Sequence, residues 1–367
     1  MRYIDEFRDP GAARTLIREI EGLLEALAPP RPLQIMEFCG GHTHAIFRYG
    51  LHQMLPEAVE WIHGPGCPVC VLPRERIDKA ISLALDHGVT LTCFGDVLRV
   101  PGTAGSLLEA RGRGADVRIV YSPLDSLALA KALPEREVVF FAIGFETTAP
   151  ATAFTVLQAD KESLANFSLL CQHVTTPSAI RALLGDPELR LDGILAPGHV
   201  STVLGSESFR FIADEYHLPV VVSGFEPLDL LQSLWMLLVQ IREGRCTLEN
   251  QYGRVARKAG SLAAKRAIAR VFEPAPSASW RGLGEIPASS LRLRGAYAGF
   301  DAERRFALNA ARHIEDPAPC GEVLKGRMRP GECPFFACRC NPENPLGALM
   351  VSSEGACAAW YRYGGRT

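Results

Sequence analysis

Short apolar runs alternate with helical patterns along most of the chain. The runs lie at 33–38, 59–63, 89–94, 117–121, 137–143, 167–171, 193–196 and 219–223. Between them, apolar residues recur at helical spacing at 44–54, 74–87, 124–133, 150–160, 177–184, 206–215 and 228–242. Continuous apolar strands that alternate with helices are typical of parallel sheets covered on both faces. The pattern therefore predicts an α/β fold of doubly wound, Rossmann-like sheets.

Eight strands over about 210 residues fit two small parallel-sheet domains better than one. We expect these domains at 31–134 and 135–244. A helical pattern at 12–28 comes before them, and beyond residue 245 the chain turns to a basic stretch at 254–270, then loops rich in proline, serine and glycine. We expect 1–30 and 245–367 to form a third, loop-rich domain. Its proline-rich tail has few apolar runs, so we expect a metal centre to help it fold.

Composition and charge exclude several classes of function. The 367 residues carry 39 Lys and Arg against 41 Asp and Glu, a net charge of −2, so no general affinity for nucleic acid is expected. The longest apolar stretch, 230–241, is far short of the ~20 residues that span a bilayer. The N-terminus has acidic residues where a signal peptide needs an apolar run. We expect a cytoplasmic protein that binds no membrane.

The chain also lacks the glycine-rich loops of phosphate-binding and dinucleotide-binding proteins, and the Gly-x-Ser-x-Gly turn of the α/β-hydrolases. Its unusual feature is a set of 11 cysteines. A chain of this length buries its core without disulfides, and clustered cysteines in a reducing compartment indicate metal or redox chemistry. Cys93 and Cys171 lie in apolar runs and are expected to be buried core thiols, and Cys246 receives no role.

The first cluster of reactive residues is Glu37-Phe-Cys39-Gly-Gly-His42-Thr-His44. It lies where the run 33–38 ends and a helix begins, the position at which open α/β sheets bind ligands. The two glycines permit a tight turn and the close approach of a ligand. A thiol near a helix N-terminus with two imidazoles nearby suits a nucleophile of low pKa or a ligand for a soft metal. The alternative is a buried cysteine beside two surface histidines.

The second cluster is Gly64-Pro-Gly-Cys67-Pro-Val-Cys70, directly after the run 59–63. A Cys-x-x-Cys pair is either half of a zinc site or a dithiol that cycles with a disulfide. Pro68 and the two glycines favour the redox loop, and no second ligand pair follows nearby. If the first two strands are neighbours in the sheet, Cys39 and this pair face one crevice.

The third cluster lies in the tail and consists of Cys320, Cys333, Cys340 and Cys357. Its spacings match neither the ferredoxin runs nor a zinc ribbon. Four thiolates suit an iron–sulfur cluster or tetrahedral zinc equally well. The redox pair elsewhere in the chain favours iron–sulfur, because zinc supplies no electrons.

Together, these motifs resemble the HypD family of NiFe-hydrogenase maturation factors. The resemblance is carried by Phe38-Cys-Gly-Gly-His-Thr-His44, Gly64-Pro-Gly-Cys-Pro-Val-Cys70, Phe94-Gly-Asp96 with Arg99-Val-Pro-Gly102, Gly144-Phe-Glu-Thr-Thr-Ala-Pro150 and Met350-Val-Ser-Ser-Glu-Gly-Ala-Cys-Ala-Ala359. It implies two α/β domains and a domain with a 4Fe–4S cluster. It also implies a scaffold that assembles an Fe(CN)2CO unit with a HypC-type chaperone, the cyanide coming from a HypE-type carrier.

The resemblance assigns roles residue by residue. Cys39 matches the iron-binding thiol and His42 the histidine beside it, while Cys67 and Cys70 match the redox pair. Asp96 and Glu354 match acidic positions of the site. The cluster ligands match Cys320, Cys333, Cys340 and Cys357. Two departures concern the third of these ligands: Ala337 stands where the family commonly has glycine, and Cys338 is an additional thiol.

We therefore expect a redox-active assembly scaffold that holds iron through Cys39, with a second thiolate supplied by the HypC-type partner. Whether such a scaffold is an enzyme in the strict sense is left open by the sequence. The alternative is an iron–sulfur-dependent thiol–disulfide reductase that acts on protein substrates. A binding module with a structural zinc in its tail is the third possibility.

Overall fold

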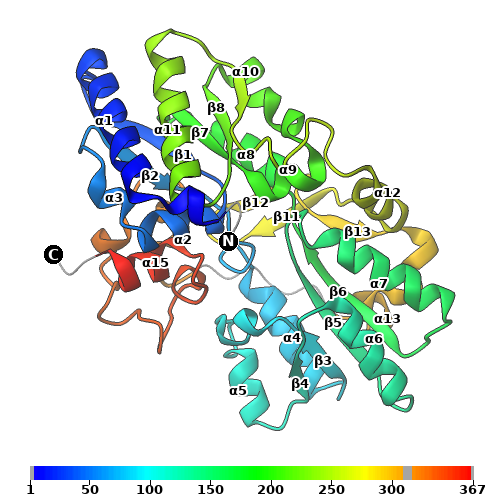
Figure 1. Cartoon of the computed structure of the whole chain (residues 1–367). Helices are drawn as coiled ribbons and strands as arrows, with labels where there is room; N and C mark the ends of the chain where they lie inside the picture. Colours follow the sequence, from blue (N-terminus) through cyan, green and yellow to red (C-terminus); the bar gives the residue numbers. More distant parts are fainter. Residues whose placement is uncertain (1–3, 309–315, 365–367) are drawn as a thin grey trace.

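The computed structural model describes residues 4–308 and 316–364 and contains two parallel sheets (Figure 1). The five-stranded sheet, here sheet A, has the order β2-β1-β7-β8-β9. Its strands are β2 (Val59–His63), β1 (Leu33–Glu37), β7 (Gly193–Pro197), β8 (Val220–Ser223) and β9 (Leu248–Asn250). All neighbours in it are parallel. Since β1 is flanked by β2 and β7, its carboxyl end lies in the middle of the sheet.

The second sheet, sheet B, has the order β4-β3-β5-β6, again with parallel neighbours. Its strands are β4 (Val117–Ile119), β3 (Thr90–Cys93), β5 (Val138–Gly144) and β6 (Phe167–His173). All seven residues of β5 are buried, as the continuous apolar run requires for a strand covered on both faces. Each of the eight predicted runs is a strand, so the predicted α/β class is confirmed.

The two sheets do not follow the predicted ranges 31–134 and 135–244. Strands β3 and β4 pair with β5 and β6, whereas β7 and β8 return to pair beside β1. Each sheet therefore takes strands from both ranges, and the strands of sheet B are inserted between β2 and β7 of sheet A. Apolar runs reveal that strands exist, but the order in which parallel strands pair depends on contacts far apart in the sequence.

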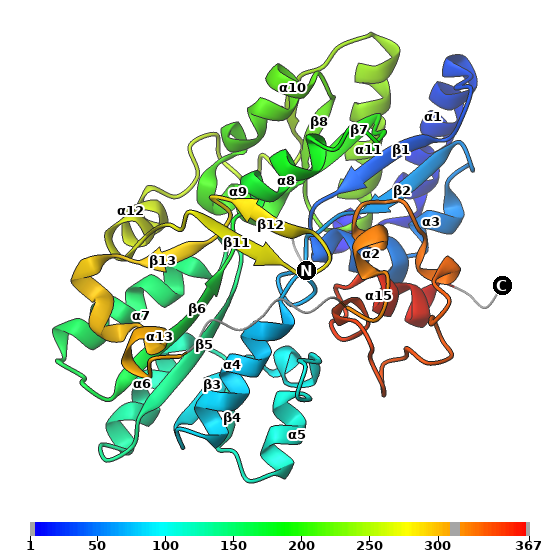
Figure 2. The same ribbon diagram turned by 180° about the vertical axis from the view of Figure 1, so that it is seen from behind.

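Helices cover both faces of the sheets (Figures 1 and 2). They are α1 (Pro10–Leu27), α2 (Gly40–Arg48), α3 (Leu51–Met54), α4 (Arg74–Leu85), α5 (Leu107–Gly112), α6 (Pro123–Ala132), α7 (Ala149–Lys161), α8 (Thr176–Leu184), α9 (Gly198–Leu204), α10 (Arg210–Tyr216), α11 (Pro227–Arg242) and α12 (Leu262–Val271). The predicted helix 44–54 is two helices, because the chain turns at Gly50 with φ 68°. Helices α5 and α9 were not predicted.

Helix α1 shows how sequence sets these elements. Asp9 caps it by accepting a hydrogen bond from the Ala12 N–H at 2.6 Å, and Pro10 occupies its first turn. Its apolar stripe, with Ile20, Leu23 and Leu24 buried, lies in the same hydrophobic core as the buried leucines of α11. No helix within 4–308 or 316–364 is long and apolar enough to cross a membrane.

The last part of the chain consists of short elements. Strands β10 (Phe272–Pro274) and β13 (Leu291–Leu293) form one antiparallel pair, and β11 (Ser277–Trp280) and β12 (Gly284–Pro287) form another. The short helices are α13 (Ala302–Arg305), α14 (Cys320–Leu324) and α15 (Ala356–Tyr363). Figure 2 shows the β11–β12 hairpin between the two sheets and α15 beside α2. The tail cysteines Cys340 and Cys357 share a hydrophobic core with Cys67, Cys70 and one face of sheet B.

Candidate functional site

A cavity of about 270 Å³ lies where the carboxyl ends of both sheets meet the tail. Its lining includes Cys39 after β1, Asp96 after β3, Thr148 after β5, His199 after β7 and Glu354 from the tail. Carboxyl ends of parallel strands are the usual ligand-binding edge of α/β sheets. Here two such edges contribute to one cavity, so the site depends on the packing of both sheets and not on either alone.

The turn that carries Cys39 is organised by the carboxylate of Glu37, which is fully buried. This carboxylate accepts hydrogen bonds from the Cys39 N–H at 2.8 Å and from the Thr43 hydroxyl, and it lies 2.9 Å from Nδ1 of His63. His63 is opposite Glu37 in the β1–β2 register. The buried carboxylate thus ties the N-terminus of α2 to the end of β2.

The loops after β1 and β2 touch through their backbones. The Gly40 N–H donates to the Gly66 carbonyl at 2.9 Å, and a Cβ atom on Gly66 would lie 2.2 Å from the Cys39 nitrogen. Only glycine permits this approach. Strands β1 and β2 are neighbours, so the condition under which Cys39 and the Cys67–Cys70 pair were expected to share a crevice is met, and their loops lie against each other.

Burial and two carboxylates raise the pKa of Cys39. Desolvation is the largest cause, followed by the negative charges of Glu354 and Glu37, and backbone N–H groups of the α2 N-terminus oppose these effects. The sequence-based expectation of a low pKa is therefore wrong for the thiol in this structure. A bound cation would reverse that balance, because a metal stabilises the thiolate directly.

His42 lies behind the cavity. It is fully buried, its Nε2 lies 3.2 Å from the Ser223 carbonyl, and its ring stacks on Phe225 with ring centres 4.7 Å apart. Burial lowers its pKa, so the ring is neutral at pH 7, and its Nδ1 has no hydrogen-bond partner among the residues that the structure describes. His44 is partly buried and its Nδ1 lies 3.2 Å from the Ser353 carbonyl. The alternative interpretation, a buried cysteine beside two surface histidines, therefore does not describe His42 or His44.

His199 is a lining residue that the sequence analysis did not select. It stacks on Phe225 with ring centres 3.6 Å apart, and burial together with His42 lowers its pKa to about 4. A signal was present in the sequence: Pro197-Gly-His199 follows a buried strand as Cys39-Gly-Gly-His42 does. Phe145, Thr147 and Thr148 also line the cavity, and they belong to the Gly144-Phe-Glu-Thr-Thr motif.

Two acidic side chains border the cavity on the side of the tail. Asp96 and Glu354 both line it, and enclosure by protein raises the pKa of each. Glu354 packs on the turn of Cys39 so closely that a Cβ atom on Gly40 would lie 2.4 Å from its Cβ. The tail thereby supplies a carboxyl group directly beside the Cys39 thiol.

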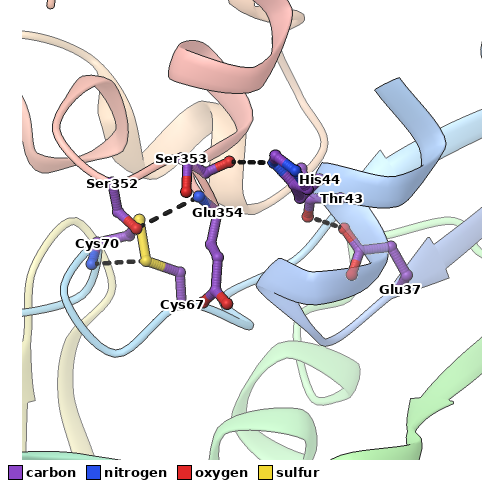
Figure 3. The surroundings of a disulfide bond; sticks show 8 residues. All are labelled: Glu37, Thr43, His44, Cys67, Cys70, Ser352, Ser353 and Glu354. Atoms are coloured by element: carbon purple, nitrogen blue, oxygen red, sulfur yellow. Dashed lines mark hydrogen bonds between the residues drawn. A yellow bond between two sulfur atoms is a disulfide. The ribbon is translucent and has the colours of Figure 1, made fainter. Parts of the chain in front are cut away.

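Cys67 and Cys70 form a disulfide that lies on the tail side of its loop (Figure 3). Both sulfurs belong to buried residues, and the Cys70 N–H donates to the Cys67 Sγ at 3.2 Å. Their loop neighbours Gly66, Pro68 and Val69 line the cavity. A Cβ atom on Gly355 would lie 3.1 Å from the Cys70 Sγ, so the disulfide touches the segment that leads into Cys357. Figure 3 shows the Glu354 side chain extending toward Cys67.

The four tail thiols lie near one another. Burial and the charges of Cys320, Cys340 and Cys333 raise the pKa of Cys357, and burial raises that of Cys320 to about 12. Cys338 differs from them because it is exposed and its thiol donates to the Pro334 carbonyl at 3.4 Å. Within the described ranges, no three His, Cys, Asp or Glu side chains are arranged to hold a metal ion. As a set of ligands, four neighbouring thiols, two of them buried and two partly buried, fit a thiophilic metal centre.

Comparison with known proteins agrees with these motifs. The family model of HypD, described as the hydrogenase formation hypA family, matches residues 12–364. The hydrogenase maturation factor HypD of Rhodobacter capsulatus is 54% identical over 372 residues, which cover 100% of this chain and 99% of that protein. The chain belongs to the HypD family. HypD of Escherichia coli (strain K12) is 53% identical over 366 residues, with 99% and 98% covered.

HypD of Azotobacter vinelandii is likewise 53% identical, with 99% of this chain and 97% of the relative covered. Since the likeness spans both sheets and the tail, it includes every residue of the cavity. The resemblance seen in the sequence is confirmed, and the chain is a hydrogenase maturation factor of the HypD family.

Proposed function

We propose that this chain is a redox-active scaffold on which the Fe(CN)2CO unit of NiFe hydrogenase is assembled. The observation that carries the proposal is the position of Cys39, whose thiol borders the cavity one loop away from a disulfide that itself touches the cysteine-rich tail. A soft thiolate suits iron that carries cyanide and CO. The iron unit is the cargo of the scaffold.

Each site residue has a role in this proposal. Cys39 binds the iron, and a HypC-type chaperone supplies a second thiolate. His42 supports the turn from behind as a neutral ring, while Asp96 and Glu354 place carboxyl groups at the cavity, where loss of hydration raises their pKa values. The reaction is proposed for the cytoplasm, where thiols stay reduced.

Cys67 and Cys70 supply the electrons for cyanide transfer. A HypE-type carrier brings cyanide as a thiocyanate, and release of cyanide from sulfur is a two-electron reduction. Two thiols become the disulfide, the S–C bond breaks, the carrier regains its thiol, one proton is released and cyanide passes to iron. The next round requires that two electrons and two protons return to the disulfide.

Cys320, Cys333, Cys340 and Cys357 would hold a 4Fe–4S cluster, which supplies single electrons when bound. The exposed Cys338 is left out of this set. The contact between Gly355 and Cys70 supports electron return from the tail to the disulfide. The alternative, a reductase for protein disulfides, would use the same dithiol, and infrared bands of metal-bound cyanide and CO on the complex with the HypC-type partner distinguish the two functions. About four irons per chain after anaerobic purification would exclude a structural zinc in the tail.

The test is Cys39→Ala, purified with its HypC-type partner. The thiol lies in a turn at the end of a strand, so its removal should cost less stability than the ~2–5 kcal/mol of a large-to-alanine core change. We expect the infrared bands of metal-bound cyanide and CO to disappear while the absorption of the tail cluster remains. Bands that persist in the variant would refute the assignment of Cys39.

A further inference from the structure

Arg281 connects the tail to the loop of the disulfide. Only 3% of the residue is exposed, and its guanidinium forms a two-pronged ion pair with Asp316, at 2.7 Å from Nε and 2.6 Å from Nη2. Asp316 is the first described residue of the tail and lies four positions before Cys320. The carboxylate is nearly as buried as its partner. The segment that leads into Cys320 is therefore held at a defined place.

The same arginine also contacts two other segments. Its backbone N–H donates to the Val71 carbonyl at 2.8 Å, and Val71 directly follows Cys70. Its Nη1 donates to the Pro101 carbonyl at 3.0 Å. One residue thus touches the disulfide loop, the loop after β3 and the start of the tail, although these segments are far apart in the sequence.

The hairpin that carries Arg281 is fixed on both sides. Trp280 is fully buried, its indole N–H donates to the Ser289 hydroxyl at 2.8 Å, and its ring lies 6.0 Å from that of Phe145, which lines the cavity. On the other side, a Cβ atom on Gly321 would lie 2.1 Å from the Gly282 carbonyl oxygen. The hairpin turn and the chain beside Cys320 are in backbone contact.

A buried ion pair contributes little net stability, because the loss of hydration offsets most of the attraction between the charges. Two-pronged arginine–carboxylate pairs do, however, fix geometry strictly. The pair joins the chain directly after the disulfide, through Val71, to the segment directly before Cys320. Its position therefore favours a role in holding these segments in register.

We propose that Arg281 and Asp316 form a latch that fixes the tail cysteines against the Cys67–Cys70 loop, so that electrons pass from the tail to the disulfide. Both are positioning residues, and the inference rests on the proposed function. The step adds two electrons and two protons to the disulfide and yields two thiols. An iron–sulfur centre held by the tail cysteines would supply these electrons one at a time, and a low-potential one-electron donor outside the chain would be their source.

The experiment uses the anaerobically purified holoprotein with dithionite as the one-electron donor. Thiols at Cys67 and Cys70 are trapped by alkylation at timed intervals and counted by mass spectrometry. We expect Arg281→Gln to slow their appearance by about tenfold or more, because shifts of ~1 Å cause losses of this size. Arg281→Lys keeps the positive charge but cannot form the two-pronged pair with Asp316. Its thiols should therefore appear faster than those of Arg281→Gln and more slowly than those of the parent. Reduction by a phosphine, which needs no path through the tail, should proceed at the parent's rate.

Two further variants distinguish a loss of positioning from a general loss of folding or of bound iron. Arg281→Met combined with Asp316→Leu leaves no unpaired buried charge, so it should fold and bind iron as the parent does and still be slow with dithionite. Arg31→Gln breaks a two-pronged pair with Asp192 that lies outside the cavity and should react as the parent does. A parental dithionite rate in both Arg281→Gln and the double variant overturns the latch. A parent without about four irons, or without dithionite-driven thiols, overturns the proposed function as well.

Discussion

At the scale of single residues, Glu37 shows how a buried carboxyl group can organise a site. Its carboxylate receives one backbone N–H, one hydroxyl and one imidazole, from residues of three different segments. A buried carboxylate with this many partners is stable, and each partner would be left unsatisfied without it. The position of the Cys39 turn relative to β2 therefore depends on this side chain.

We expect Glu37→Gln to lower the free energy of unfolding by about 1–3 kcal/mol, since an amide replaces one acceptor oxygen with a donor that faces donors. Chemical denaturation of the purified chain measures the loss. Glu57→Gln, at an exposed position before β2, is the matched control and should change stability by less than about 0.5 kcal/mol. Equal stability of the two variants would show that Glu37 does not organise the turn.

Glu146 leads to a prediction on pH. It is buried, accepts hydrogen bonds from the backbone N–H and the hydroxyl of Thr176 at 2.8 Å each, and burial raises its pKa from about 4.5 to about 7. Between these values the folded chain binds a proton that the unfolded chain has lost. This contribution to stability is complete below pH 4.5 and is lost as the pH rises through 7.

In the parent, the free energy of unfolding should fall by roughly 3 kcal/mol as Glu146 ionises. A glutamine side chain cannot ionise, so Glu146→Gln should not show this fall. The measurement is the free energy of unfolding at a series of pH values, for the parent and for the variant. The difference between the two curves should change steadily from pH 4.5 to 7 and then level off. A constant difference across this range would contradict the raised pKa.

At the scale of elements, the loops after β1 and β2 pack so closely that one of them has no room for a side chain at Gly66. A Cβ atom on Gly66 would come within 2.4 Å of both the nitrogen and the Cα of Cys39, and a backbone cannot yield as a flexible side chain can. We expect Gly66→Ala to destabilise the chain by about 1–3 kcal/mol. Thermal melting checks this value, and alkylation should find Cys39 more reactive as the loops separate.

Gly112 in α5 provides the contrasting substitution. Apart from its own helix and chain neighbours, no described residue has an atom within 4 Å of a Cβ built there, so Gly112→Ala should raise stability by about 0.5–1 kcal/mol through the better helix propensity of alanine. If both alanine variants melt at the parent's temperature, the loop contact is not as close as the structure has it.

The elements also show what a sequence can reveal. The strands β1 to β8 of the two parallel sheets were predictable because most of them are buried on both faces and therefore form continuous apolar runs, whereas the short, partly exposed β9 of sheet A was not predicted. The order in which the strands pair could not be predicted, since nothing in the sequence of β2 indicates that β3 belongs to another sheet. The pKa of Cys39 was mispredicted because the fold buries the thiol and, secondarily, because it brings the carboxylate of Glu354 from far along the chain to its turn. His199 was missed because a single histidine after a strand resembles many others.

At the scale of the whole molecule, the tail places apolar residues such as Val323, Leu349 and Met350 in the same core as one face of sheet B. Loss of one proposed cluster ligand should therefore affect the whole chain. We expect Cys357→Ala to lose the bound iron and to melt well below the parent, because binding energy at such a centre is folding energy. Cys338→Ala, which removes only an exposed thiol, should keep both iron and melting temperature.

Iron content and calorimetry of the anaerobic proteins decide between these outcomes. Removal of iron from the parent with a chelator should reproduce the melting temperature of Cys357→Ala. Iron loss in Cys338→Ala together with its retention in Cys340→Ala would reverse the choice of the third ligand.

The insertion of sheet B between β2 and β7 has a consequence for the growing polypeptide. Strand β1 has β2 on one side as soon as both have left the ribosome, but its other neighbour is synthesised only after all four strands of sheet B. At ordinary elongation rates this delay is on the order of ten seconds. During that time the nascent chain presents the future centre of sheet A as a bare edge, open to aggregation or to a chaperone.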